Sequence, residues 1–409
     1  MTDFDWDGYA ALDGLDGLDG FNERLRDLLE TVRAWFSDYV AVTNLGDLDL
    51  LALWTVHTYV CPQTWSTPRL IIDSITPGSG KTTVLEHLKH LCHAPISAAA
   101  LTSAALLARV FKDGPRTLLI DEVHRTLSPT NPNLNDLIAI LNSGYKPGGE
   151  RPVLTPTGKG AWEPEMMPTF GPVAMAGNAP QLPDDTRQRS IRILLMPDSE
   201  GTIQESDWEE IEPRAADLQA LIAEVMESAR DSIKQHKPIV PADCKGRMKE
   251  KWGPLARIAQ VAGGDWPKKV EDLIMDDLEE QRLEREDGIE KRPAGVVLLD
   301  DLARIWPEES RFVRTPDLIR YLISCRPDYW GESSSFGKAL TSQRLGRLLT
   351  QAAKIHSTKL DGARGYTKES FAYVWRRMGI TPGKQTVQTV HTVQTDSPSD
   401  LFADGPDAA

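Results

Sequence analysis

The segment 75–82, ITPGSGKT, matches the phosphate-binding pattern G-x-x-x-x-G-K-[ST] except at its first position, where Ile75 replaces a glycine. In such a loop, successive backbone N–H groups and the start of the next helix converge on anionic oxygens. Lys81 would meet the β- and γ-phosphates of a nucleotide, and the Thr82 hydroxyl would hold Mg²⁺. Ile75 precedes the cradle of N–H groups, so its presence constrains the turn without removing a ligand. The candidate nucleotide-binding residues are Pro77, Gly78, Ser79, Gly80, Lys81, Thr82 and Thr83.

The alternative interpretation is an ordinary strand-to-helix turn that contains a lysine. The flanking sequence favours the phosphate loop. An apolar run at 68–74 predicts a buried strand before it, and the pattern at 81–92 predicts a helix after it.

A second apolar run, RTLLIDEV at 116–123, predicts a buried strand that delivers Asp121 and Glu122 at its carboxyl end. This is the end of a strand where α/β proteins bind ligands. Asp121 would hold Mg²⁺ through water, alongside Thr82, and Glu122 would polarise an attacking water. An Asp-Glu pair alone usually marks a solvated strand end. Here it follows the loop by about 40 residues, which suits a βαβ-type unit with one further helix.

Two further runs predict strands at 170–178 and 190–196. The first ends in Asn178, which could orient water or touch the γ-phosphate, or could simply occupy a turn before Ala-Pro. Before the second, Arg189 could reach a neighbouring subunit's nucleotide and neutralise charge in the transition state, with Arg187 as the second candidate. The alternative is an arginine that caps a surface turn.

Strands that alternate with helices predict an α/β fold with a parallel sheet covered on both faces. The expected organisation has six parts: a disordered acidic leader (1–20), an N-terminal helical lead (21–63), a phosphate-loop core (64–203), a small all-α unit in the position of a lid (204–292), a basic winged-helix-like domain (293–380) and a disordered tail (381–409).

Composition limits the broad class of the protein. The chain has 409 residues and a net charge of −14, and no apolar run reaches the roughly 18 residues needed to cross a bilayer. Its four cysteines show no paired metal spacing and fit a reducing compartment, and the acidic start does not resemble a signal peptide. We therefore expect a cytoplasmic protein without membrane contact.

The charge is unevenly spread along the chain. Between Lys338 and Arg377, nine basic residues face two acidic ones, a net charge of +7. Local charge steers a polyanion better than total charge does, so DNA is an expected partner.

The C-terminal pattern is typical of a winged helix, with a helix at 341–355 followed by two short strands around a glycine-bearing turn. Leu345, Leu348 and Leu349 share one face of that helix, which leaves the basic side chains largely off it. A winged helix that only binds protein is the competing interpretation.

A basic, glycine-rich segment at 142–151, NSGYKPGGER, could grip DNA in the pore of a ring, or could be an exposed turn. Arg257 lies in the predicted all-α unit; the resemblance of this unit to the lid of AAA+ ATPases implies a second sensing arginine there, although an ordinary surface helix is favoured. The candidate DNA-binding residues are Lys146, Arg151, Arg344, Arg347, Lys354, Lys359 and Arg364.

The order of loop, Asp-Glu strand, Asn strand and arginine resembles that of AAA+ ATPases. More closely, the motifs TPRLIIDSITPGSGKTTVLEHL, TLLIDEVH, LNSGYKPGG, LPDDTRQRSIRI, WGPLARIAQVAGGDWP and GYTKESF resemble the phage, plasmid and actinobacterial ATPases grouped as domain of unknown function 3631. The resemblance covers about 50–378. Loops of this family also tend to lack the leading glycine. It implies ATP hydrolysis near DNA, often beside primase or helicase modules.

The tail carries Asp400, Leu401 and Phe402, which resemble the end of a sliding-clamp-binding peptide, although Pro398 stands where the usual glutamine would be. A short anchor in such a segment is one way to recruit a tethered partner.

The sequence as a whole favours an ATP- and Mg²⁺-dependent motor that acts on DNA. The expected form is a homo-oligomeric ring, such as a hexamer, that works as a helicase or translocase in phage or mobile-element DNA replication. The alternative is an ATP-switched binding protein that loads, recruits or inhibits replication factors, with the sliding clamp as one candidate.

Overall fold

The computed structural model describes residues 18–74, 76, 78–99, 108–123, 134–156, 161–178, 182–198, 201–286, 294–334, 337–360 and 362–380. The chain divides between Arg282 and Leu283 into two compact units, which are described separately as unit 1 and unit 2. In the described part of the chain, no helix is both long and apolar enough to span a membrane.

Unit 1 is built on a five-stranded parallel sheet in the order β2-β3-β6-β1-β7. The strands are β1 (Arg69–Ser74), β2 (Pro95–Ala98), β3 (Thr117–Ile120), β6 (Val173–Asn178) and β7 (Ser190–Leu195). The parallel α/β sheet predicted from the alternating pattern is therefore confirmed. All six residues of β1 are buried, as a central strand covered on both faces requires.

Helices cover both faces of this sheet. Leu70 and Ile72 of β1 join one large core with helices from the N-terminal and C-terminal parts of unit 1. Ile71 points to the other face of the sheet and joins a second core there. The helices of the first face are α2 (Leu18–Tyr39), α3 (Gly46–Val60), α4 (Lys81–Leu91), α9 (Trp208–Gln235), α10 (Arg247–Ala262) and α11 (Trp266–Glu286). A short 3₁₀ turn, η2 (Cys61–Gln63), follows α3.

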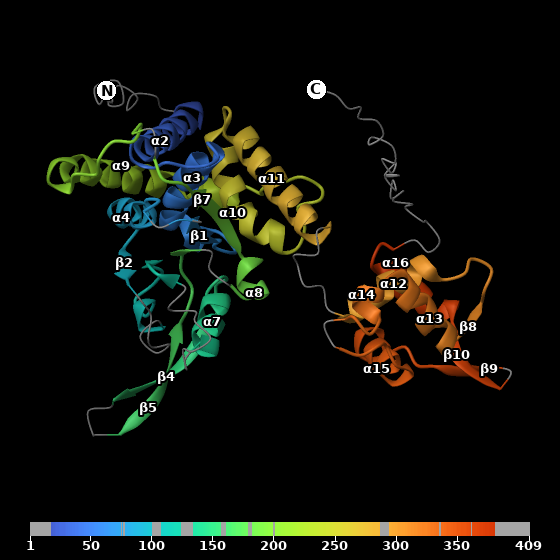
Figure 1. Ribbon diagram of the computed structural model, residues 1–409. Helices are drawn as coiled ribbons and strands as arrows, with labels where there is room; N and C mark the ends of the chain where they lie inside the picture. The colour runs from blue at the N-terminus through green and yellow to red at the C-terminus, as the bar shows by residue number, and fades with distance from the viewer. Residues whose placement is uncertain are drawn as a thin grey trace, which may run out of the picture. The chain divides into compact units, whose positions relative to one another are not determined.

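The second face carries α7 (Leu134–Ser143) and the segment around Phe111. Between α7 and β6 the chain forms an antiparallel hairpin of β4 (Glu150–Pro156) and β5 (Trp162–Pro168), which projects from the body of unit 1 (Figure 1). The short helix α8 (Asp184–Arg187) leads into β7.

Unit 2 packs helices around a small antiparallel sheet in the order β8-β10-β9. Its elements are α12 (Ala294–Ile305), β8 (Phe312–Arg314), α13 (Thr315–Cys325), α14 (Pro327–Trp330), α15 (Ser342–Ala353), β9 (Thr358–Leu360), β10 (Ala363–Thr367) and α16 (Lys368–Arg377). The two short strands predicted around a glycine-bearing turn are β9 and β10, and Gly362 between them has a φ of +81°.

Candidate functional site

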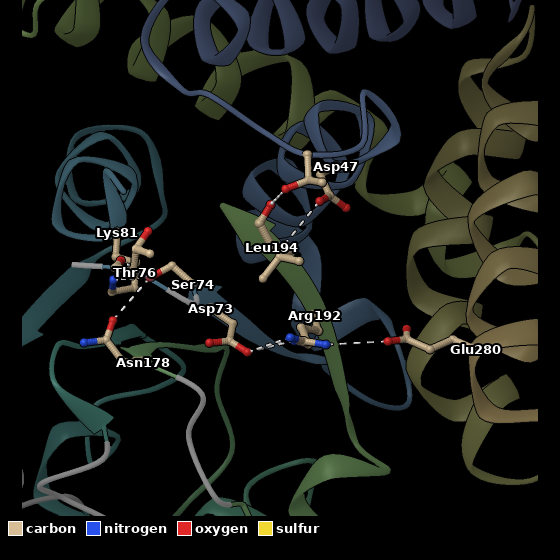
Figure 2. A network of polar contacts seen from close by, with 10 residues as sticks. Asp47, Asp73, Ser74, Thr76, Lys81, Asn178, Arg192, Leu194 and Glu280 are labelled. Carbon is tan, nitrogen blue, oxygen red and sulfur yellow. Dashed lines mark hydrogen bonds and ion pairs between the residues drawn. The ribbon is translucent and has the colours of Figure 1, made fainter. Parts of the chain in front are cut away.

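The carboxyl ends of β1, β3 and β6 bring together the polar residues predicted from separate parts of the sequence. Because the strands are parallel and adjacent, they end at one edge of the sheet, where Ser74 of β1 is in register with Asn178 of β6. The loop after β1 lies at this edge, which we call the carboxyl edge (Figure 2). Ligands of open α/β sheets bind at such an edge, where the connections of neighbouring strands run in opposite directions.

The loop itself has the backbone that a phosphate cradle needs. Gly78 and Gly80 have φ values of +76° and +81°, and a Cβ at either position would meet no atom within 4 Å. The glycines are therefore required by their left-handed conformation and not by close packing. Gly80 also precedes the first turn of α4, whose free N–H groups face the loop end. Pro77 and Ile75 lie outside the described residues.

Lys81, the first residue of α4, reaches back over the loop to β1. Its Nζ donates a hydrogen bond to Ser74 Oγ, and Ser74 Oγ lies 3.2 Å from Asn178 Oδ1 and 2.8 Å from the Thr76 carbonyl oxygen (Figure 2). A hydroxyl has one proton, so Ser74 can donate to only one of these oxygens at a time. Ser74 was not predicted as a site residue. Its signal was available, since it is the polar residue that ends a buried strand.

The two predicted metal-site residues are in contact. Thr82 Oγ1 donates a hydrogen bond to Asp121 Oδ2 at 3.1 Å, which joins the start of α4 to the end of β3. Both offer oxygen ligands, which suits Mg²⁺. Thr83, the next residue of α4, is half-buried.

Glu122 follows Asp121 in an unusual conformation. Its φ is +47°, and its backbone N–H donates to Asp121 Oδ1 at 2.8 Å. A non-glycine residue in this left-handed region costs about 1–2 kcal/mol. Such strain accumulates at functional sites, where the surrounding structure holds a side chain in a required place.

An ion-pair network lies beside the loop on the second face of the sheet. Arg192 of β7 contacts Asp73 at 2.9 Å and Glu280 of α11 at 3.6 Å (Figure 2). Asp73 is buried, and Arg192 is half-exposed. The network therefore links the strand before the loop to the helix α11.

Asp47 lies close to this network, at the start of α3. It accepts a hydrogen bond from the Leu194 N–H at 3.4 Å (Figure 2). Burial raises the pKa of Asp47 to about 7, an effect that the Leu194 hydrogen bond opposes and nearby Glu280 reinforces.

Arg189 is not gathered with the loop. It precedes β7, and β7 runs parallel to β1 with Ser190 opposite Arg69, so Arg189 lies at the opposite, amino edge of the sheet. Its guanidinium donates to the Asp185 carbonyl, pairs with the Asp185 carboxylate at 3.2 Å and is largely buried. Arg187 of α8 pairs with Asp184 at 3.4 Å and is much more exposed.

The amino edge holds a second, fully buried arginine. The Arg69 guanidinium donates to the Leu141 carbonyl at 2.6 Å and to the Gly171 carbonyl at 2.5 Å. Burial lowers its pKa to about 9. It lies near Tyr145, whose buried hydroxyl has no hydrogen-bond partner among the residues that the structure describes. These contacts tie the ends of β1, α7 and β6 together.

The candidate DNA-binding residues of unit 1 are held by carboxylates. Lys146 pairs with Glu250 of α10 at 2.8 Å, and Arg151 pairs with Asp136 of α7 at 2.6 Å. Arg257 donates to the Gln63 carbonyl at 3.2 Å, so it fastens α10 to the turn after α3. A contact with DNA at Lys146 or Arg151 would have to replace these ion pairs.

In unit 2, α15 buries Leu345 and Leu349 and keeps Leu348 half-buried. Arg347 of α15 is exposed, and Arg344, whose N–H donates to the Thr341 cap at 3.2 Å, is half-buried. Lys354, the C-cap of this helix, is exposed and has a φ of +55°.

Two basic side chains face each other across the strands of unit 2. Lys359 of β9 is paired directly with Arg364 of β10, and both are exposed. Like charges in this arrangement repel. A bound anion would relieve that repulsion. The tail residues Asp400, Leu401 and Phe402 lie outside the described residues.

No curated protein matches the chain. Among solved structures, the chain is similar to the C-terminal region of NrS-1 in its apo A form, at 12% identity and a TM-score of 0.36, over 84% of this chain and 74% of that one. It is also similar to the active helicase Cch of SCCmec type IV, at 10% identity and a TM-score of 0.38, over 81% and 68% of the two chains.

A third similar structure is the Holliday junction branch migration motor RuvB of Thermotoga maritima, at 14% identity and a TM-score of 0.24, over 83% of this chain and 95% of that one. A family model does match, over residues 199–378, and its description is "Protein of unknown function (DUF3631)". The resemblance to this family, which the motifs indicated, is thus confirmed over 199–378.

Proposed function

We propose that unit 1 binds ATP with Mg²⁺ at the carboxyl edge of its sheet and hydrolyses it. The observation that carries this proposal is the contact between Thr82 and Asp121 at 3.1 Å, at the end of a loop whose two glycines both have positive φ. The two residues are 39 positions apart in the sequence, and a plain strand-to-helix turn has no need of that contact.

The roles of the loop residues follow from their chemistry. The N–H groups of 78–81 and the start of α4 would bind phosphate oxygens, which are anionic. Lys81 would leave Ser74 to meet the β- and γ-phosphates, and Ser74 and Asn178 keep it poised until then. Thr82 and Asp121 would hold Mg²⁺. When bound, the ion neutralises charge on the phosphate oxygens.

Glu122 would orient and polarise the attacking water. Its strained backbone supports this role, because an ordinary strand end would not require a non-glycine residue at positive φ. Asn178, at the end of the neighbouring strand, would help to position the same water or the γ-phosphate.

Removal of a metal-site residue tests this assignment. Asp121→Asn should reduce hydrolysis by about 100-fold or more, the size expected for lost stabilisation of transition-state charge, and should raise the Mg²⁺ concentration needed for half-maximal rate. Asp317→Asn is the matched control, since Asp317 pairs with Arg320 within α13 of unit 2. Equal rates and equal Mg²⁺ dependence in both variants would remove the proposed metal site.

We further propose that Arg187, rather than Arg189, acts on the nucleotide of a neighbouring copy in a homo-oligomeric ring. Both arginines lie at the amino edge, away from their own loop, and each pairs with an aspartate of α8. The Arg187 side chain is the more exposed of the two, whereas Arg189 is largely buried. An arginine supplied from a second subunit can neutralise transition-state charge.

Mixing two inactive variants tests action between subunits. Arg187→Ala subunits keep Glu122, and Glu122→Gln subunits keep Arg187, so a mixed interface can form one intact site and some hydrolysis should return. Mixtures as inactive as the separate variants would contradict a role for Arg187 between subunits.

We propose DNA as the partner of unit 2, through the exposed basic groups of α15 and the β9–β10 turn. The facing pair of Lys359 and Arg364 supports phosphate contact, because an anion would offset their repulsion. With ATP hydrolysis in unit 1, the function that this favours is an AAA+-like motor on DNA, a helicase or translocase in replication. In this proposal α9, α10 and α11 act as the lid of the core, and unit 2 as a winged helix.

Salt dependence and strand separation test this part. Each phosphate contact contributes about −0.9 to the log–log slope of affinity against salt on duplex DNA. Lys359→Ala with Arg364→Ala should therefore flatten the slope by about two units, while Lys268→Ala, an exposed lysine of α11, should leave it unchanged. ATP-dependent unwinding of a forked duplex would support a helicase, and its absence would favour the ATP-switched binding protein.

A further inference from the structure

Trp65 has the highest exposure of any tryptophan in the described part of the chain, 71%. It lies in the short segment between η2 and β1, at the amino edge of the sheet, and the residues next to it in that segment, Thr64, Ser66 and Thr67, are buried. A single exposed apolar side chain is ordinary on a protein surface. The residues around Trp65 therefore decide whether it could bind a ligand.

Two hydrogen bonds fix the backbone that follows Trp65. The Ser66 hydroxyl donates to the backbone carbonyl of Glu250, in the first turn of α10, at 2.5 Å. The Thr67 N–H donates to the backbone carbonyl of Tyr145, in the chain that follows α7, at 3.0 Å. The segment that carries Trp65 therefore lies against both the start of α10 and the chain after α7, and its backbone is held in place.

The side chains that this arrangement brings near Trp65 are mostly basic. Lys146 pairs with the Glu250 carboxylate at 2.8 Å, and Arg247 pairs with the same carboxylate at 3.0 Å. All three of these side chains are partly exposed. Two further lysines, both exposed, lie two positions before and after Arg247 in the sequence: Lys245 and Lys249.

The charge around Trp65 is positive, although the chain carries −14 overall. Two acidic residues stand against four basic ones, a balance of +2; they are Asp243 and Glu250 against Lys146, Lys245, Arg247 and Lys249. Gly246, the N-cap of the 16-residue helix α10, makes no side-chain cap, so the positive end of the helix dipole adds to this charge. The Arg69 guanidinium, which lies near Tyr145, donates to backbone carbonyls, which do not cancel its charge.

An exposed indole beside several cations fits single-stranded nucleic acid. The bases of an unpaired strand stack on aromatic side chains, and its phosphates contact lysine, arginine and helix N-termini. In a duplex, both faces of each base are covered by neighbouring base pairs, so Trp65 would have no base to stack on. The centre of a protein–protein interface is depleted of charged residues, whereas Trp65 is surrounded by them.

We propose that Trp65, Lys146, Arg247 and the start of α10 form a site for single-stranded nucleic acid on unit 1, which we call the Trp65 site. A base stacks on the indole, and the neighbouring phosphates contact Lys146 and Arg247. These two cations exchange the Glu250 carboxylate for the strand. The Trp65 site is distinct from the DNA surface proposed for unit 2 and needs no ATP, so this inference goes beyond the proposed function.

Anisotropy of a fluorescent oligothymidine, measured without nucleotide, tests the stacking contact. The full chain carries Lys359→Ala and Arg364→Ala throughout, which reduces the contribution of unit 2. Trp65→Ala should weaken binding by about tenfold, the size expected for one stacked base, and Trp65→Phe should keep most of the affinity. Trp162→Ala, a matched control at 61% exposure beside the acidic Glu163, should leave binding unchanged.

Glu250→Gln gives a second readout, which misfolding could not mimic. It removes the carboxylate that competes with phosphate for Lys146 and Arg247, so binding should tighten by about threefold, a size typical of an exposed ion pair. Lys146→Ala should weaken binding and flatten the log–log slope of affinity against salt by about 0.7. Weaker binding by Glu250→Gln, in a protein with the circular dichroism of wild type, would contradict the proposed exchange.

Further outcomes would overturn the Trp65 site. They are unchanged binding by Trp65→Ala, equal losses in Trp65→Ala and Trp162→Ala, and an equal loss by Trp65→Ala on a blunt duplex. A change of oligomeric state in Trp65→Ala with unchanged strand binding would assign Trp65 to a contact between copies instead. Oligouridine, measured alongside, shows whether DNA or RNA is the tighter ligand. Because no nucleotide is present, a chain that does not hydrolyse ATP could still pass every one of these tests.

Discussion

The carboxyl and amino edges of the five-stranded sheet both carry cations, but the two sets are bonded differently. At the carboxyl edge, Lys81 contacts the Ser74 hydroxyl, a neutral group that it can leave. At the amino edge, Arg69 is buried on backbone carbonyls and Arg189 is fastened to Asp185. The difference indicates that the partner of a cation, more than its residue type, separates a candidate binding group from a structural one.

The largest expected difference between the two edges is in the free energy of unfolding. Arg69→Met should lower the free energy of unfolding by about 3 kcal/mol, because the Leu141 and Gly171 carbonyls would lose charged hydrogen bonds in a buried site. Lys81→Met should change it by less than about 1 kcal/mol. Urea denaturation of both variants checks this. Similar losses in the two would erase the distinction between the edges.

A second effect concerns pH at the amino edge. His57 is fully buried and hydrogen-bonded to Thr67 at 3.1 Å, and burial lowers its pKa to about 3 from the usual value of 6.5. Below pH 6.5 the unfolded chain binds a proton that the folded chain does not, so this group reduces stability as the pH falls from 6.5 towards 3.

His57→Gln should remove that contribution. Relative to wild type, the free energy of unfolding of the variant should rise by about 2 kcal/mol between pH 7 and pH 5. Denaturation of wild type and variant at both pH values measures this difference. His87 and Asp47 are present in both proteins, so their contributions cancel. Parallel pH profiles for the two proteins would show that His57 is not the source.

The smallest effect is at the carboxyl edge. Glu122→Gly should raise the free energy of unfolding by about 1 kcal/mol, since glycine adopts positive φ without the steric cost, and it should abolish hydrolysis. Glu122→Ala keeps the strained backbone and should lose only the activity. A stability gain in the alanine variant as large as in the glycine variant would point to charge rather than strain.

Much of the fold could be predicted from the sequence. Four of the five parallel strands stood out as continuous apolar runs, because both of their faces are buried. β2, Pro95–Ala98, was missed because three of its residues are half-buried and Ser97 is exposed, so it forms no such run. The β4–β5 hairpin was missed because each of its strands contains two prolines, which argue against a strand unless they fall on outward positions.

The candidate site could be predicted where the order of strands and motifs along the chain determines which residues meet. The contact between Thr82 and Asp121 follows from two strands of one parallel sheet, whose carboxyl ends must coincide. The partners of the other cations depend on distant residues. Glu250, which holds Lys146, is 104 positions away, and no local pattern in the sequence marks that pairing.

The central claim is that the carboxyl edge binds and hydrolyses ATP, and one pair of variants tests it most directly. Equilibrium binding of a fluorescent ATP analogue and steady-state release of phosphate would be measured for wild type, Lys81→Ala and Glu122→Gln. The account predicts that Lys81→Ala loses binding and turnover, while Glu122→Gln binds as wild type does and releases phosphate at least about 100-fold more slowly. Undiminished binding in the first variant together with undiminished turnover in the second would contradict it.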